Sequence, residues 1–373
     1  MKKILLFVVA LTACITTLTP AISFAQVGEP VIEAPTPDTY YRARVIKILE
    51  SGDIDVDGVS QFHQKLQLEI LNGNEKGKKI TIDHGATFAI QDYQKVQPGE
   101  TVVITKPSSS PIPDFYYITD KYRLPNVLIL VAIFFGLAIF FGRKRGLTSI
   151  IGLLFSAGVI FWFLIPRIAS GHPPLAAAII AALAITFVSL FLSHGFNRRT
   201  TIAMVSTLLA LGGAILMDIA FVTFAKLSGT GSEEAFYLQI GTGTIDLRGV
   251  LLAGILIGVL GVLDDITTAQ AATVEEIYLA NPSVSLAQLY KSGLSVGREH
   301  IASLVNTLVL AYVGASFPLF LLYSMQKSTE LWVTLNSNFI AEELIRTLVG
   351  SSVLVLAVPL TTFLASWWMT KKK

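Results

Sequence analysis

A polar run interrupts a long apolar stretch of the chain. Asp264 and Asp265 are followed within five residues by Thr267, Thr268 and Gln270. Carboxylate, hydroxyl and amide oxygens suit hard cations, and intramembrane carboxylates also relay protons. A charged side chain at the centre of a bilayer costs about 2.5–3.5 kcal/mol on insertion scales, and adjacent carboxylates repel each other. The pattern therefore predicts an ion or proton site, while the alternative is that these residues mark the inner end of a span and face lipid headgroups.

A third acid, Asp218, lies inside another apolar run, between Met217 and Ile219. At the helical rise per residue, Asp218 is ~27 Å from the inner start of its run, and Asp264 is ~22 Å from the outer start of the next. In a hydrocarbon core of about 30 Å these positions fall in opposite thirds. We expect the two acids not to share one ion, so Asp218 would gate from the other side or simply be packed in the bundle.

The elements that must position these acids are apolar. Of 373 residues, 53% are hydrophobic and 14% charged, and the mean hydropathy is +0.63. Soluble domains carry about 25% charged residues. Apolar runs of about 20 residues predict an α-helical membrane protein in which residues 124–373 form the transmembrane bundle. The seven predicted spans are 124–142, 147–166, 174–193, 201–225, 249–269, 301–323 and 345–369.

The connection after the fifth span is predicted to be ordered. Asn281-Pro282 should stop one helix, and Ser285 with Gln288 three residues later should cap the next.

Cationic residues orient this bundle. Ten fall on one side and six on the other, and the larger group sits in the short connections that decide orientation. The N-terminal domain is therefore expected outside and the C-terminus inside a bacterial cytoplasmic membrane. The inner group is Arg143, Lys144, Arg145, Arg198, Arg199, Lys291, Arg298, Lys371, Lys372 and Lys373; the outer group is Lys121, Arg123, Arg167, Lys226, Arg248 and Lys327.

Residues 26–123 are more polar and predict a small extracytoplasmic β-rich domain. Short β-like runs occur at 41–48, 65–71, 78–83 and 101–105, separated by turn signals such as Asn72-Gly73-Asn74. Leu66, Leu68 and Ile70 alternate and should share one face. Five or six such strands suggest a barrel-like domain or a sandwich.

The N-terminus has the pattern of a signal peptide over residues 1–25. Lys2 and Lys3 precede an apolar run that ends in small residues, which predicts cleavage after Ala25. An uncleaved first helix and lipidation at Cys14 are the two alternatives. Cys14 is also the single cysteine, so no disulfide can form within one copy.

Other chemistries lack their motifs. The net charge of +2 does not indicate nucleic acid. No hydrolase, metalloprotease or nucleotide-binding fingerprint occurs, and the histidines show no zinc spacing. Cofactor and metal stay unknown, and an intramembrane enzyme ranks third among the functions considered.

Several segments resemble the YibE/F family of bacterial multi-pass membrane proteins. They are GVLGVLDDITTAQ at 258–270, VEEI at 274–277, VGREHIA at 296–302, NTLVLAY at 306–312 and GAILMD at 213–218. The likeness covers essentially the whole chain after residue 25. It implies a membrane location and this architecture rather than a particular activity.

Two functions follow as predictions. The first is a permease or ion- or proton-coupled transporter, in which Asp264 and Asp265 bind or relay a small cation or proton with support from Thr267, Thr268 and Gln270. The second is a non-transporting scaffold or envelope assembly factor, whose β domain binds an envelope partner while the bundle anchors it in the lipid bilayer.

Overall fold

The computed structural model describes residues 38–56, 59–86, 89–110, 112, 114–242, 245–325 and 330–371. The predicted signal peptide, its cleavage after Ala25 and the alternative at Cys14 lie outside these residues. The chain divides into two compact units between Gly136 and Leu137. The first contains a β-sheet and the second a helical bundle.

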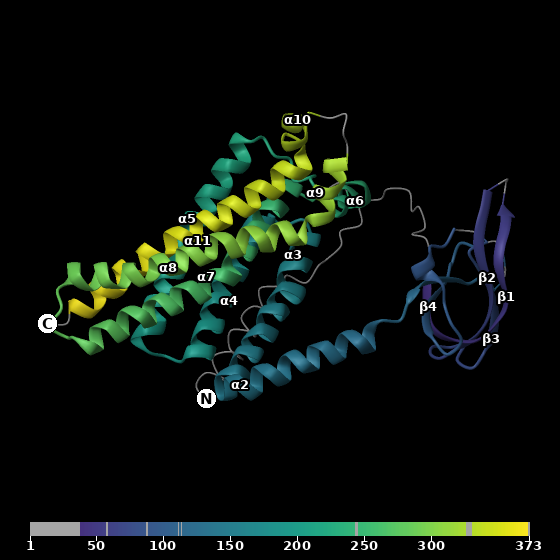
Figure 1. Ribbon diagram of the computed structural model, residues 1–373, viewed down its shortest axis with the longest axis horizontal. Helices are drawn as coiled ribbons and strands as arrows, with labels where there is room; N and C mark the ends of the chain where they lie inside the picture. Colours follow the sequence, from purple (N-terminus) through teal and green to yellow (C-terminus); the bar gives the residue numbers. More distant parts are fainter. Residues whose placement is uncertain are drawn as a thin grey trace, which may run out of the picture. The chain divides into compact units, whose positions relative to one another are not determined.

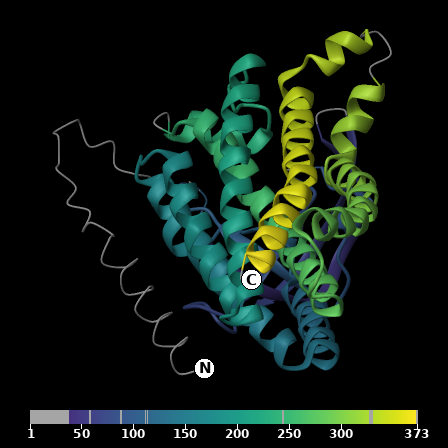
Figure 2. The same ribbon diagram turned by 90° about the vertical axis from the view of Figure 1, so that its left-hand side faces the viewer.

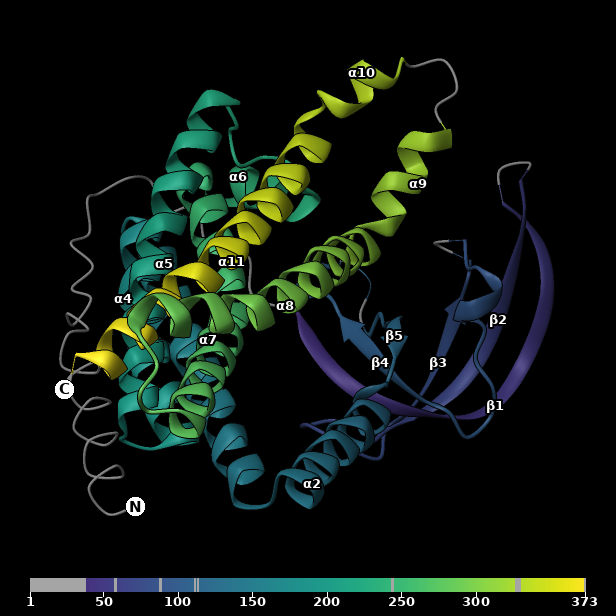
Figure 3. The ribbon, with the colours of Figure 1, turned by 60° about the vertical axis from the view of Figure 1, so that its left-hand side comes forward.

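The first unit is one antiparallel sheet in the order β3-β2-β1-β4-β5. The expected face of Leu66, Leu68 and Ile70 is fully buried, which confirms the alternation. The long β1 pairs with β2 along most of its length and with β4 near its start. In Figure 3, β1 is the long curved strand. The strands are β1 (Thr39–Val56), β2 (Val59–Ile70), β3 (Lys79–His84), β4 (Thr101–Lys106) and β5 (Tyr117–Lys121).

The prediction of a barrel-like domain is wrong in one respect, because the sheet does not close into a barrel. β3 and β5 are the two ends of the sheet, and no ladder joins them in the part of the chain that the structure describes. Both strands are short, with six and five residues. A closed barrel needs every strand hydrogen-bonded on both sides, so this unit is an open sheet.

The second unit is helical, and Figure 1 labels its elements. A π-helix, Ile160–Leu164, joins the first two helices. The helices are α2 (Leu124–Val159), α3 (Ile165–Ala169), α4 (Pro174–His194), α5 (Arg198–Phe224), α6 (Glu233–Thr242), α7 (Leu247–Ala280), α8 (Leu286–Ala315), α9 (Phe317–Met325), α10 (Leu331–Leu335) and α11 (Asn338–Thr370).

The helix boundaries between α7 and α8 confirm the sequence interpretation. α7 ends at Ala280, directly before Asn281. Ser285 and Gln288 form a reciprocal capping box at the start of α8, with the Ser285 hydroxyl accepting from the Gln288 amide. The connection between α7 and α8 is thus two helix ends and a short turn.

The described residues contain five helices long and apolar enough to cross a membrane, or six if α8 and α9, bent by 68°, form one span. Seven were expected. The count differs because the first two predicted spans belong to one candidate of 46 residues, Leu124–Ala169. A straight helix of that length would be ~69 Å, more than twice a bilayer core.

The backbone turns inside this candidate, at the cationic cluster that separated the predicted spans. Arg143 is non-helical, with φ of 50°. A Cβ on Gly146 would stand 2.0 Å from the Ala138 carbonyl oxygen, although these residues would be ~12 Å apart along a continuous helix. Gly146 is therefore required where the chain doubles back.

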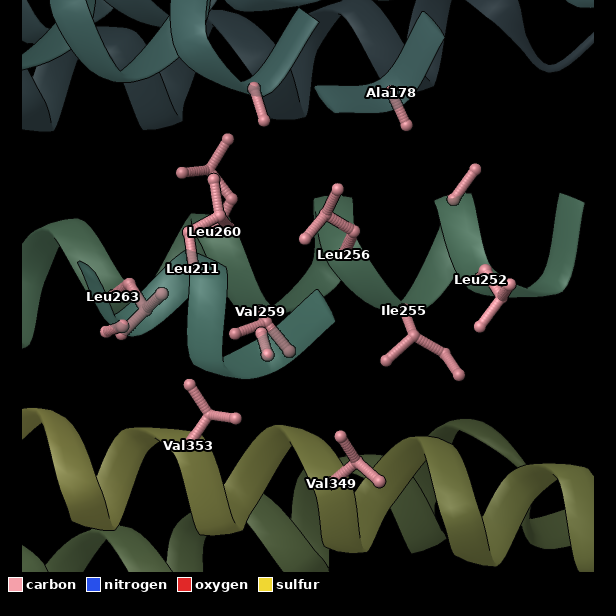
Figure 4. Close-up of a cluster of buried hydrophobic side chains, with 14 of the residues drawn as sticks. Ala178, Leu211, Leu252, Ile255, Leu256, Val259, Leu260, Leu263, Val349 and Val353 are labelled. Atoms are coloured by element: carbon pink, nitrogen blue, oxygen red, sulfur yellow. The ribbon is translucent and has the colours of Figure 1, made fainter. Parts of the chain in front are cut away.

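The core of the bundle surrounds α7, which packs against α4, α5, α8 and α11. Figure 4 shows leucine, isoleucine and valine side chains of α7 directed towards the neighbouring helices on several sides. Leu256 and Leu263 are fully buried, and Val349 and Val353 of α11 pack in the same cluster. A helix that is apolar all round belongs in the middle of a bundle.

Large apolar side chains also cover the outside of the bundle. Trp162 is 81% exposed, Leu216 of α5 72% and Phe224 78%. In Figure 2, α11 runs beside its neighbours with its outer side uncovered. Soluble monomers rarely expose apolar surface on this scale, so the outer faces are consistent with contact to lipid.

Candidate functional site

Asp264 and Asp265 of α7 line a cavity of about 320 Å³ between the second part of α2, α4 and α7. Asp264 is largely buried, and its Oδ1 has no hydrogen-bond partner among the described residues. Asp265 is exposed to the cavity and the surface. No described lysine or arginine forms an ion pair with either acid, so the site has two carboxylates and no countercharge in contact.

Polar side chains that the sequence analysis did not select complete the lining. Ser149 and Ser156 come from α2, and Ser189, Ser193 and His194 come from α4. The serine spacings of seven and four place each pair on one helix face. The regular spacing of these hydroxyls on apolar helices could have marked them in the sequence as candidate site residues. Only the fold shows that both pairs line the same cavity as the acids.

Thr268 stays near the acids but bonds to its own helix. Its hydroxyl donates to the backbone carbonyl oxygens of Asp264 at 2.6 Å and Asp265 at 3.1 Å. Hydroxyls in helices commonly bond backward in this way. Thr268 does not line the cavity, so it supports the local backbone and offers no group to a ligand there.

Thr267 and Gln270 point to other helices. The Thr267 hydroxyl is 2.8 Å from the hydroxyl of Thr207 on α5. The Gln270 amide nitrogen donates to the Gly293 carbonyl oxygen of α8 and to the Thr362 hydroxyl of α11. The structure therefore brings together only Asp264 and Asp265 of the predicted cluster, because successive helical residues turn by about 100°.

Asp218 of α5 is fully buried, and neither carboxylate oxygen has a partner in the described part of the chain. Three contacts fix the antiparallel register of α5 and α7: Arg199 with Glu275, Thr207 with Thr267, and Arg248 with Thr223.

In this register Asp218 lies about eight residues, or ~12 Å, from Asp264 along the bundle axis. The two acids therefore stand at different levels, and one ion could not touch both.

A π-helix borders the cavity, with Ile160 in the lining. Pro166 follows two residues after it and has no N–H to donate to the Trp162 carbonyl, so the regular helical pattern fails locally. π-helical turns of this kind often occur at functional sites.

The sheet unit handles its charges differently. Lys106 bonds Glu75 at 2.7 Å and Asp114 at 3.0 Å, while Lys78 bonds the same two acids at 3.0 and 2.9 Å. Tyr116 donates to Glu75. The Lys106 hydrogen bond, with Tyr116 and Lys78, lowers the pKa of Glu75 to about 2, and Lys78 with Lys106 lowers the pKa of Asp114 to about 2.

Within the described residues, no three His, Cys, Asp or Glu side chains are grouped so as to hold a metal ion. In the cavity beside α7, the oxygen groups that could contact a cation are the two carboxylates of α7 and the serine hydroxyls of α2 and α4.

Apolar helices of membrane-spanning length, joined to a small antiparallel sheet, indicate a membrane protein. The family model for YibE/F-like proteins matches residues 130–371, and that for the YibE/F family N-terminal domain matches residues 40–120. The chain belongs to the YibE/F-like family. No curated protein and no solved structure matches it.

Proposed function

We propose that this protein is a permease that moves a small cation or a proton-coupled solute across the membrane. The observation that supports the proposal most is the cavity lined by Asp264 and Asp265, in which neither acid contacts a countercharge. An ionised carboxylate in apolar surroundings is costly unless a proton or cation neutralises it. Such a site therefore has a built-in affinity for positive charge.

Asp218 provides a second acidic position at another level of the bundle. It is fully buried beside α7, about 12 Å along the axis from Asp264. A solute could not contact both acids at once, so Asp218 would act at a separate step, as a gate or a proton relay. Intramembrane acids that face the inside of a bundle are commonly parts of such pathways.

Uptake into proteoliposomes tests the proposal. Asp264→Asn and Asp265→Asn should abolish cation- or proton-driven flux, because the amide cannot carry the charge. Asp53→Asn, a change at an exposed acid of β1, is the control and should keep parental flux. Undiminished flux with Asn at both 264 and 265 would end the transport-site hypothesis.

The proposal includes a location. The bundle crosses the bacterial cytoplasmic membrane with the sheet domain outside and the C-terminus inside, as the distribution of cationic residues supports. A cytoplasm-only reporter after Lys373 and an export-only reporter after Ser110 should both be active. Mature protein should begin at Gln26. A cytoplasmic reporter active at Ser110 would overturn the orientation.

A scaffold that binds an envelope partner is the second candidate. The observation in its favour is the open sheet, in which β3 and β5 each pair on one side only among the described residues. Free strand edges can accept an added strand from a partner. Crosslinking from β3 that captures one stable partner, with flux unaffected by Asp264→Asn, would favour this function over transport.

A further inference from the structure

The cavity beside Asp264 has a polar end and an aliphatic end. α4 and α7 run parallel, since Pro174 packs on Gly249 near the start of both helices. α2 runs the opposite way, since Gly152 packs against Ser189 and Ser193. These contacts set the levels of the lining residues along the bundle axis.

At one end Asp264 and Asp265 are level with Ser189, and Ser193, His194 and Ser149 follow one turn later. Leu153 and Leu190 also line the cavity at the level of the acids, so this end combines the polar groups with two leucines. About four to seven residues away, or ~6–10 Å along the axis, the lining is aliphatic. That part is formed by Ile160, Ile185, Ile257 and Leu260.

The size of the cavity argues against a bare inorganic ion as its main ligand. Its 320 Å³ is about ten times the ~30 Å³ that one water occupies in the liquid. Hard cations need oxygens at about 2.3–2.6 Å on several sides, which aliphatic side chains cannot supply. A cavity of this volume, mostly apolar with a few converging polar groups, suits a small organic molecule.

From this arrangement we infer that the cavity binds a small organic ammonium ion. The ammonium group lies at Asp264 and Asp265, donating its three N–H groups to their carboxylates and to the Ser189 hydroxyl. A short hydrocarbon chain extends among Ile160, Ile185 and Ile257. The inference rests on the proposed function, since it names the solute class of the same site.

Thermal unfolding of the purified full-length protein in detergent tests it, because a ligand of the folded state raises the unfolding temperature. The ligands are ammonium, ethylammonium and butylammonium chloride at constant ionic strength, with NaCl and butanol as controls. Affinity should rise about fourfold for each methylene group that the aliphatic end buries. Butanol should not stabilise, because it lacks the charge.

Two variants distinguish a failure of this inference from a failure of the proposed function. Ile257→Trp fills the aliphatic end, so it should remove the dependence on chain length but keep the response to ammonium. Asp264→Asn should remove stabilisation by every cation. Equal stabilisation by sodium, ammonium and butylammonium, with Asp264-dependent flux intact, would overturn this inference and leave the proposed function standing. Flux that survives Asp264→Asn would overturn both.

A second, independent observation concerns α6 and α10, two short helices outside the candidate spans. They expose aromatic and aliphatic side chains: Phe236 53%, Tyr237 70% and Ile240 69% on α6, and Leu331 74% and Trp332 66% on α10.

Both helices lie at the same end of the bundle. α6 directly precedes α7, α10 directly precedes α11, and α7 and α11 run parallel, as the contacts of Gly350 with Val259 and of Thr362 with Gln270 require. Figure 1 shows α6 and α10 at that end.

Short tethers hold them beside the spans. Two residues separate α10 from α11 and four separate α6 from α7, so the gaps reach at most ~10 and ~17 Å even when fully extended. Tryptophan and tyrosine favour the membrane–water interface. We propose that α6 and α10 lie in the headgroup region of the leaflet at this end of the bundle and anchor it to lipid.

Trp332 reports on this proposal directly. With Trp162, Trp367 and Trp368 changed to Phe, it is the single tryptophan of the full-length chain. In phosphatidylcholine vesicles, bromines near the headgroup end of the acyl chains should quench its emission more than bromines near the terminal methyl. Tyr93→Trp in a chain whose native tryptophans are replaced by Phe, at a position 71% exposed in the sheet unit, is the control and should not be quenched. Unquenched, water-like emission from Trp332 would overturn the proposal.

Discussion

Glu75 of the sheet and the acids Asp218 and Asp264 of the bundle are held in opposite ways. In the sheet, Glu75 is bonded by Lys78, Lys106 and Tyr116. In the bundle, Asp218 and the Oδ1 atom of Asp264 are buried with no partner among the described residues. Paired charges near water stabilise a fold slightly, whereas unpaired buried acids destabilise it. The proposed transport site therefore contains acids that lack the partners Glu75 has.

The largest expected effect is a loss of apolar packing in the bundle. Leu256 of α7 is fully buried in the core of Figure 4. Leu256→Ala should lower the free energy of unfolding by about 2–5 kcal/mol, through lost burial and the cavity left behind. Thermal unfolding in detergent measures it. Leu216→Ala, on an outward position of α5, is the control and should change stability by less than about 0.5 kcal/mol. Equal losses would contradict the assignment of the core.

Loss of a hydrogen-bonded contact between helices of the bundle should have a smaller effect. Gln270 joins α7 to α8 and α11 through two hydrogen bonds. Gln270→Leu should cost about 1 kcal/mol, as typical for hydrogen bonds between membrane helices. Thr268→Val is the control, because the Thr268 hydroxyl bonds only its own helix. If Gln270→Leu removed cation binding without loss of stability, Gln270 would belong to the site after all.

The smallest effect is expected in the sheet, where it depends on pH. Its partners lower the pKa of Glu75 from its ordinary value of 4.5 to about 2. The stabilisation is therefore complete above about pH 4.5 and is lost as the pH falls towards 2. Hydrogen-exchange protection of β2 and β3, corrected for intrinsic rates, should decline over that range.

Glu75→Gln should weaken this pH dependence, with Asp114 retaining its part, at a cost of at most about 1 kcal/mol at neutral pH. The exposed Glu50→Gln is the control. Unchanged protection between pH 4.5 and 2 in the parent would show that the ion-pair cluster does not stabilise the sheet.

Patterns that depend on neighbours in sequence were predictable. The alternation of Leu66, Leu68 and Ile70 identified β2, and the capping residues Ser285 and Gln288 identified the start of α8. Both signals are local, since side-chain direction and helix capping are fixed by a few consecutive residues.

Patterns that depend on tertiary packing could not be predicted from the sequence. Thr267 and Gln270 are adjacent to the acids in sequence but face α5, α8 and α11. Ser189 and Ser193 are far from them in sequence yet share their cavity. The open edges at β3 and β5 likewise depend on how the whole sheet coils, which hydrophobic alternation does not specify.

The most direct test of the contrast between the units measures stability and flux on one preparation of Asp264→Asn. Removing an unpartnered buried acid should leave the unfolding temperature equal to or above that of the parent, because no bond is lost and desolvation is relieved. Flux per folded molecule should be abolished. A marked fall in unfolding temperature with parental flux per folded molecule would mean that Asp264 is structural, and would contradict the account.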